Sequence, residues 1–289
     1  MLKKIQFVIP VLFFFVSVLS AQDGKTLLIR CDDIGMSHSV NMAAKELIDA
    51  GIPFSASVMF ACPWYQEAVD LLKKHPEISV GVHLTLNAEW KNYRWGPVTG
   101  KNAVPSLVDS CGYFTPSRAL FEANKPKLKE IEKELRAQVE RAMNSGLKIS
   151  YLDHHMSTAV ERPEYRKIVE KLAREYHLGI STYFQERYLN TMYNDPVDKK
   201  ADSLKVILSG LSQDRVNLLV CHIGKDTPEL QAMEDLNSFG LKEMSRHRQA
   251  ELNGLLSLKK EILNGSFRLI NYEKLVSERG LKSMTKPVE

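Results

Sequence analysis

The chain has 289 residues, of which 44% are hydrophobic and 26% are charged. This is the composition of a globular protein, and it excludes a disordered or fibrous chain. The formal net charge of +4 is small and is not concentrated in a basic tract, so it gives no support for a nucleic-acid partner. The length suits one large α/β domain or two smaller ones.

The first residues are typical of a secretory signal peptide. Lys3 and Lys4 precede an apolar run over 5–19, which ends in Ser20-Ala21-Gln22. A membrane span needs about 20 apolar residues, so this run is too short to be one. We therefore expect residues 1–21 to be removed from an exported protein, periplasmic or secreted, whose net charge falls from +4 to +2 because two lysines leave with them.

The cysteines are Cys31, Cys62, Cys111 and Cys221. An even number of cysteines permits disulfides in an exported protein, but the wide spacing does not resemble a disulfide framework. Cys31 and Cys221 each end an apolar run, which favours buried thiols.

Short apolar runs alternate with segments of helical periodicity along the chain. The pattern predicts strands near 27–31, 55–60, 78–86, 148–152, 178–182, 216–221 and 267–270. Helices are expected over 37–51, 63–72, 126–146, 163–176, 201–209, most of 239–263 and from 272 onward. The segments 87–124 and 185–200 show no sustained period, and long loops of this kind often carry function.

Strands that alternate with helices predict a parallel sheet with helical crossovers. Seven such units run on without a low-complexity linker, which favours one closed or nearly closed barrel over two domains. We expect a single distorted (β/α) barrel over residues 22–289, with about seven parallel strands and the helices outside.

Polar residues follow several of the predicted strands. The first strand ends in Asp32-Asp33, the third carries His83, the fourth ends in Asp153-His154-His155, and the sixth ends in His222. Each has an ordinary interpretation as a turn residue, a hydrogen-bonded core histidine or a loop histidine. In a parallel barrel, however, the carboxyl ends of all strands lie on one face, so these side chains are expected to converge there.

One carboxylate and two imidazoles form an open site for a divalent ion. Adjacent residues in an extended segment point to opposite sides, so only one of His154 and His155 can join a given ion. His155 is the better candidate, with Asp153 or His154 orienting a ligand from behind. A bound ion activates a water molecule, and the spare acid of the Asp32-Asp33 pair can take its proton.

Three stretches resemble the motifs of the YdjC-like carbohydrate deacetylases, a family similar to the polysaccharide deacetylases. They are Asp32-Asp33-Ile34-Gly35-Met36-Ser37, Val80-Gly81-Val82-His83-Leu84-Thr85-Leu86 and Leu152-Asp153-His154-His155. The resemblance implies a metal-dependent hydrolase with a distorted barrel that removes an acetyl group from an N-acetylated sugar.

The resemblance also implies roles for single residues. Asp33, His83 and His155 would hold a divalent ion, Mg²⁺ or Zn²⁺, Asp32 would be the general base, and His222 would protonate the leaving amine. The chain departs from the family pattern at Cys31, at Ile34, at His154, at Met156-Ser157-Thr158 and at Ile223, while the three metal positions are kept.

Aromatic residues suggest where a sugar would bind. Trp90, Trp95 and Arg94 follow the strand of His83, and Trp64 follows the second strand. These side chains can stack on sugar rings or pack the loop onto the barrel.

The expected partner is an N-acetylated mono- or oligosaccharide, and a homodimer is left open. Two alternatives remain. The first is another metallohydrolase on the same site, an esterase or a phosphoesterase. The second is a non-catalytic carbohydrate-binding protein.

Overall fold

A computed structural model describes residues 24–189 and 192–287. The expected signal peptide, residues 1–21, lies outside this part of the chain. Within it, no helix has both the length and the apolar character to cross a membrane.

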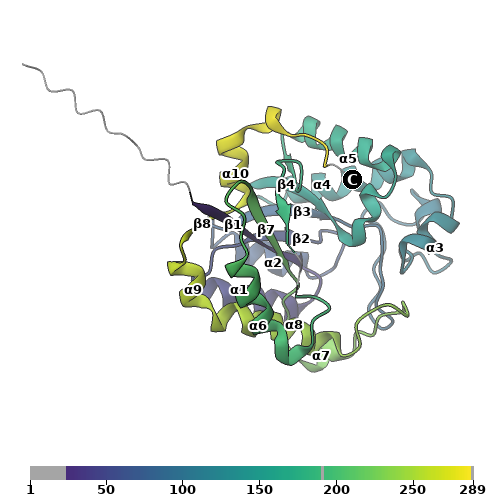
Figure 1. Ribbon diagram of the computed structural model, residues 1–289. Helices are drawn as coiled ribbons and strands as arrows, with labels where there is room; N and C mark the ends of the chain where they lie inside the picture. Colours follow the sequence, from purple (N-terminus) through teal and green to yellow (C-terminus); the bar gives the residue numbers. More distant parts are fainter. Residues whose placement is uncertain (1–23, 190–191, 288–289) are drawn as a thin grey trace, which may run out of the picture.

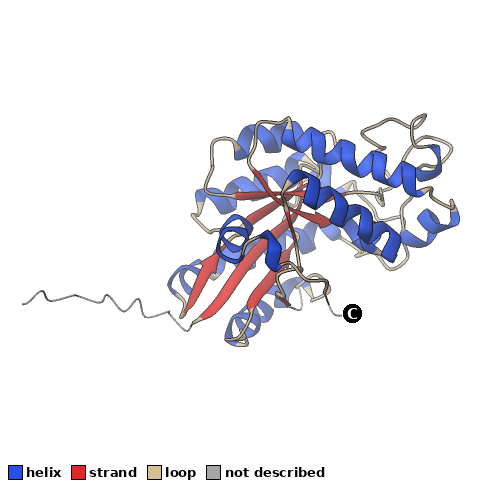
Figure 2. Ribbon diagram, turned by 90° about the horizontal axis from the view of Figure 1, so that it is seen from above, coloured by secondary structure: helices blue, strands red, loops and turns tan. Residues whose placement is uncertain are grey.

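The described residues contain one parallel sheet of eight strands, which curls into an incompletely closed barrel (Figures 1 and 2). The strands are β1 (Lys25–Ile34), β2 (Ser55–Val58), β3 (Ser79–Leu84), β4 (Ile149–His154), β5 (Gly179–Ile180), β6 (Arg187–Tyr188), β7 (Val216–Cys221) and β8 (Phe267–Ile270). Their order is β5-β4-β3-β2-β1-β7-β6, with β8 beside β1. The predicted barrel of parallel strands is confirmed.

The longest strand, β1, organises the sheet. Its first half pairs with β8, from Lys25 opposite Phe267 to Leu28 opposite Ile270, and its second half pairs with β2. Strand β7 runs along the other side of β1. Eight of the ten residues of β1 are buried, which explains why its sequence is almost continuously apolar until the two acids.

Ten α-helices surround the sheet in the described residues. They are α1 (His38–Asp49), α2 (Tyr65–Leu72), α3 (Arg118–Ala123), α4 (Leu128–Met143), α5 (Pro163–Tyr176), α6 (Lys200–Ser209), α7 (Pro228–Gln231), α8 (Met244–Ser257), α9 (Lys259–Asn264) and α10 (Tyr272–Arg279). In Figure 1, α4 and α5 lie above the sheet, and α1, α6 and α8 lie below it.

The differences from the sequence prediction lie in short elements. The segment 87–124, expected to be irregular, contains α3 and a 3₁₀ turn at Pro105–Leu107. Strand β6 falls in the second irregular segment, and its two residues are too few to show a period. Helix α8 begins at Met244, because 237–240 forms a turn in which the Gly240 N–H donates to the Asn237 carbonyl at 3.0 Å.

The cysteines are all free thiols, and Cys31, Cys62 and Cys221 are buried. Cys31 and Cys221 lie opposite each other on β1 and β7. The expectation of buried thiols at these two positions is confirmed.

Candidate active site

The end of β1 departs from regular strand geometry at the two acids. Cys31 pairs with Ala56 and Ile34 pairs with Val58, so three steps along β1 match two along β2. This is a β-bulge, and Asp33 within it has a left-handed backbone with φ of 64°. A bulge redirects side chains. Both acids are consequently buried and line the same cavity, although neighbours in a regular strand would point to opposite faces.

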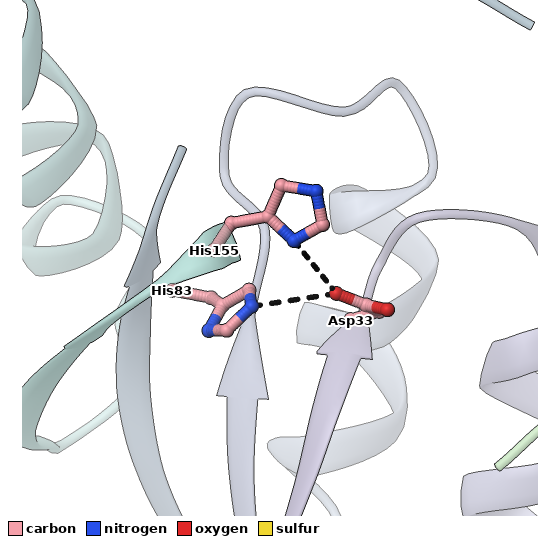
Figure 3. Close-up of side chains that lie close together, drawn as sticks. All are labelled: Asp33, His83 and His155. Atoms are coloured by element: carbon pink, nitrogen blue, oxygen red, sulfur yellow. Dashed lines mark ion pairs between the residues drawn. The ribbon is translucent and has the colours of Figure 1, made fainter. Parts of the chain in front are cut away.

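Two imidazoles converge on one oxygen of Asp33 (Figure 3). The Nε2 atom of His83, in β3, lies 3.3 Å from Asp33 Oδ1. The Nδ1 atom of His155, which follows β4, lies 3.2 Å from the same oxygen. The three side chains are buried.

The donor set fits a divalent ion. Asp33 Oδ1 is buried and has no hydrogen-bond partner of good geometry among the described residues, despite the two nearby nitrogens. Ligands about 2.0–2.2 Å from a metal ion lie about 3.0–3.5 Å from one another, which matches the two measured separations. One carboxylate and two imidazoles leave coordination positions open for water and substrate.

In each imidazole, the ring nitrogen that does not face Asp33 lies close to another carboxylate. Asp153 Oδ1 is 3.0 Å from His83 Nδ1, and Glu89 Oε2 is 3.0 Å from His155 Nε2. Burial alone would lower the imidazole pKa values, but Asp153 and Asp32 raise the pKa of His83 to about 10. Glu89 and Asp33 likewise raise the pKa of His155 to about 9. Such carboxylates fix the ring orientation and increase the basicity of a ligating histidine.

Two buried guanidinium groups complete the charged cluster. Arg248 Nη2, from α8, donates to Asp33 Oδ2 at 2.6 Å. Arg30 donates to both oxygens of Asp32 at 2.7 Å, and its Nε lies 3.0 Å from Asp153 Oδ2. Burial alone would raise the pKa of Asp33, but Arg248 and the two imidazoles hold it well below its usual range.

The formal charge of this cluster supports a divalent cation. Four carboxylates (Asp32, Asp33, Asp153, Glu89) and two guanidinium groups (Arg30, Arg248) give −2 when both imidazoles are neutral. In the ion-free protein the protons that the raised pKa values keep on His83 and His155 offset this charge, and a divalent cation would offset it when both imidazoles are deprotonated as ligands.

A second set of possible metal ligands consists of Asp32, His83 and Asp153, whose ligand atoms lie within 4.8 Å of one another. The Arg30 guanidinium already bridges the two carboxylates of that set. The set around Asp33 is therefore the better candidate for the ion.

His222 lies at the end of β7 and lines the same cavity. Its backbone N–H donates to Glu251 Oε2 at 2.7 Å, and Tyr193 contacts its ring edge-on with the ring centroids 5.0 Å apart. Burial lowers the pKa of His222 to about 4, so the imidazole is neutral at neutral pH. His154 also lines the cavity, and burial lowers its pKa to about 4 as well.

The cavity has a volume of about 940 Å³, and Trp90 is the one tryptophan among the described residues that lines it. Trp95 is buried with its ring beside that of His155, at a centroid distance of 6.3 Å. Trp64 packs on His38, and Arg94 donates to Asp109 and to the Phe114 carbonyl. Among the described residues, Trp64, Trp95 and Arg94 thus lie outside the cavity lining, and a sugar-binding role for them stays a prediction.

Several charged residues of the site carried no identifiable sequence signal. Glu89 lies in a segment without a period, and Arg248 lies on a helix 215 positions from its partner Asp33. Arg30 could have been found, because it stands two residues before Asp32, on the same side of the strand.

These features define the class of protein: an α/β barrel-like fold with a buried carboxylate–imidazole cluster at the carboxyl ends of its strands that could hold a metal ion. The family model described as YdjC-like protein matches residues 26–262, and the chain belongs to this family.

Two relatives are each named carbohydrate deacetylase. The Brevibacillus brevis protein is 36% identical over 154 residues, which are 53% of this chain and 58% of that protein. The Enterococcus faecalis protein is 29% identical over 269 residues, covering 87% of this chain and 98% of that protein. The match to the first relative thus spans little more than half of its length.

Two solved structures share the fold. The crystal structure of a candidate cellobiose-phosphate cleavage protein from Enterococcus faecalis has a TM-score of 0.71 at 24% identity, and covers 87% of this chain and 99% of that one. The Xyl-CE4 domain of a xylanase from the hindgut metagenome of Trinervitermes trinervoides has a TM-score of 0.52 at 9% identity, and covers 92% of this chain and 95% of that one.

Proposed function

We propose that this protein is a metal-dependent hydrolase that removes the acetyl group from an N-acetylated sugar or oligosaccharide. The observation that carries the proposal is the unpartnered oxygen of Asp33 between the imidazoles of His83 and His155. Membership of the YdjC-like family and the names of the relatives support the choice of substrate class.

In this proposal Asp33, His83 and His155 hold a divalent ion, either Mg²⁺ or Zn²⁺. The bound ion would lower the pKa of a water molecule and polarise the acetyl carbonyl. Asp153 and Glu89 hold the two imidazoles in the orientation that directs a lone pair at the site.

Asp32 is suited to accept the proton of the attacking water. Its carboxylate lines the cavity, and each oxygen accepts one hydrogen bond from Arg30. A carboxylate oxygen has two lone pairs, so each retains one for a proton or a water molecule. The rigid pairing with Arg30 fixes the direction of those lone pairs, which favours proton transfer.

His222 is suited to pass a proton to the departing amine. Its Nδ1 atom has no hydrogen-bond partner among the described residues. Because the ring is neutral at neutral pH, it must first accept a proton within the site and can then donate it.

Acetate release from a panel of N-acetylated glycans, measured with and without a chelator, tests this function. We expect release that the chelator abolishes, and expect Asp33→Ala and His83→Ala each to lose it. Asp49→Ala and His75→Ala are matched controls, because these residues pair with surface neighbours and are not in the cavity lining of the described residues. Full activity of either site variant would refute the assignment. If the protein cleaved a phosphoester and none of the N-acetylated glycans, it would be a phosphoesterase and the proposal of a deacetylase would be wrong.

We further propose that the protein is exported, on the strength of the basic and apolar character of residues 1–21. Expression of the full chain in a bacterial host, followed by N-terminal sequencing of the periplasmic fraction, should give a protein that begins near residue 21 or 22. An uncleaved cytoplasmic product would contradict export.

A further inference from the structure

Two exposed aromatic side chains line the mouth of the cavity that contains the Asp/His cluster. Phe239 is 73% exposed and Tyr188 is 53% exposed, and both contribute to the cavity lining. They come from different parts of the fold, since Tyr188 lies in β6 and Phe239 lies in the loop before α8. Large apolar side chains that remain exposed at a cavity mouth often mark a ligand-binding surface.

The loop that carries Phe239 is held in place by hydrogen bonds. Trp90 and Asp235 form an antiparallel bridge, and the Leu236 N–H donates to the Glu89 carbonyl at 2.8 Å. Asn237 Nδ2 donates to the Pro116 carbonyl at 2.8 Å. The loop is thereby tied to the segment that supplies Glu89, the residue behind the imidazole of His155.

A tight turn presents the Phe239 ring. The Gly240 N–H donates to the Asn237 carbonyl at 3.0 Å, which closes the turn over 237–240. A Cβ atom on Gly240 would approach the Asp235 carboxylate to 2.1 Å, so any larger residue there would displace the Asp235 side chain. Hydrogen bonds of Leu236, Asn237 and Gly240 thus anchor the segment on both sides of the exposed Phe239.

Tyr188 is fixed in a comparable way. Strand β6 pairs with β7, with Tyr188 opposite Leu218, and the Leu189 N–H donates to the Leu218 carbonyl at 3.0 Å. Both rings are thus attached to hydrogen-bonded backbone before any ligand binds. This reduces the conformational entropy that the protein loses on binding.

We infer that Phe239 and Tyr188 form a sugar-binding subsite beyond the acetylated ring, and that the preferred substrate is an oligosaccharide whose neighbouring rings contact them. The apolar face of a pyranose ring stacks on an aromatic ring much as two apolar rings do. A cavity of about 940 Å³ is at the upper end of the range for small-ligand sites, and so has room for more than one sugar ring. This inference rests on the proposed function for the identity of the reacting ring.

Binding of an N-acetylated hexosamine as mono-, di- and trisaccharide, measured by calorimetry on the metal-loaded full chain, tests the subsite. Phe239→Ala and Tyr188→Ala should each weaken trisaccharide binding by about tenfold and leave monosaccharide binding within about twofold. Phe239→Trp should retain trisaccharide affinity, whereas Phe239→Leu should lose it, because stacking needs a flat ring. Tyr113→Ala is the matched control, since this tyrosine is 40% exposed and is not in the cavity lining of the described residues.

The outcomes separate this inference from the proposed function. Length-dependent binding that the two variants lose, without any acetate release, would support the subsite and overturn the deacetylase. Acetate release with the same affinity for all three lengths would support the deacetylase and overturn the subsite. Equal weakening of all lengths by Phe239→Ala, or no glycan binding by the unaltered protein, would also overturn the subsite.

Discussion

Binding of a divalent ion at Asp33, His83 and His155 should release about two protons at pH 7.5. In the ion-free protein the pKa values of His83 and His155 are raised to about 10 and about 9. Both values lie above the pH, so both imidazoles carry a proton. A ring nitrogen must be deprotonated to ligate a metal, and each imidazole therefore loses one proton on binding.

The sign of the pH dependence follows from the same shifts. Below about pH 9 the ion competes with two protons, so its apparent affinity should fall by up to about a hundredfold for each unit that the pH decreases. Above about pH 10 both imidazoles are already neutral, and the affinity should no longer depend on their titration.

Calorimetric titration with Zn²⁺ at pH 7.5, in buffers of different ionisation enthalpy, measures the number of protons. The slope of the observed enthalpy against the buffer ionisation enthalpy should be negative, because the buffer takes up the released protons, with a magnitude of about two for the unaltered protein and for His75→Ala. The magnitude should fall to about one or less for His83→Ala. A slope near zero for the unaltered protein would show that the imidazoles are neutral before the ion binds, and would refute the reasoning.

Three further changes test single parts of the site. Asp32→Asn should lower kcat by about 10²–10⁴-fold with the ion still bound, as measured by acetate release and metal analysis; unchanged kcat would exclude it as the base. Glu89→Gln should weaken metal affinity by about 10–100-fold, against no change for the exposed Glu234→Gln, and equal affinities would contradict its role behind the imidazole. Arg248→Met should lower the free energy of unfolding by about 3–5 kcal/mol in urea denaturation, because the buried Asp33 carboxylate loses the guanidinium group that donates to its Oδ2 atom. The exposed Arg246→Met on the same helix should change it by less than about 0.5 kcal/mol, and similar losses in both would contradict the buried pair.

The sequence contained enough information for the fold class and for the convergence of the candidate ligands. Apolar strands separated by amphipathic helices predict parallel pairing, and the carboxyl ends of parallel strands meet on one face. This is why Asp33 and His222 could be placed together across 189 positions of sequence. This rule needs only the order of strands and helices along the chain, and local sequence patterns predict that order.

Other parts of the site depend on contacts that no local pattern encodes. The bulge that turns Asp33 toward His83 arises from the pairing of two strands, and a list of residues does not show it. Arg248 is one of many charged residues on a helix until the fold brings it to Asp33. The aromatic residues show the same limit, because Trp95 is buried although it stands in a segment without a period, and Phe239 is exposed in a loop although it stands at the start of a predicted helix.

Metal content of the purified protein is the most direct test of the account. After dialysis against a low concentration of Zn²⁺, the unaltered chain should hold about one ion, while Asp33→Ala and His83→Ala should hold far less and keep the same circular dichroism spectrum. Retention of a full equivalent by both folded variants would show that the ion does not bind between these side chains, and would contradict the account.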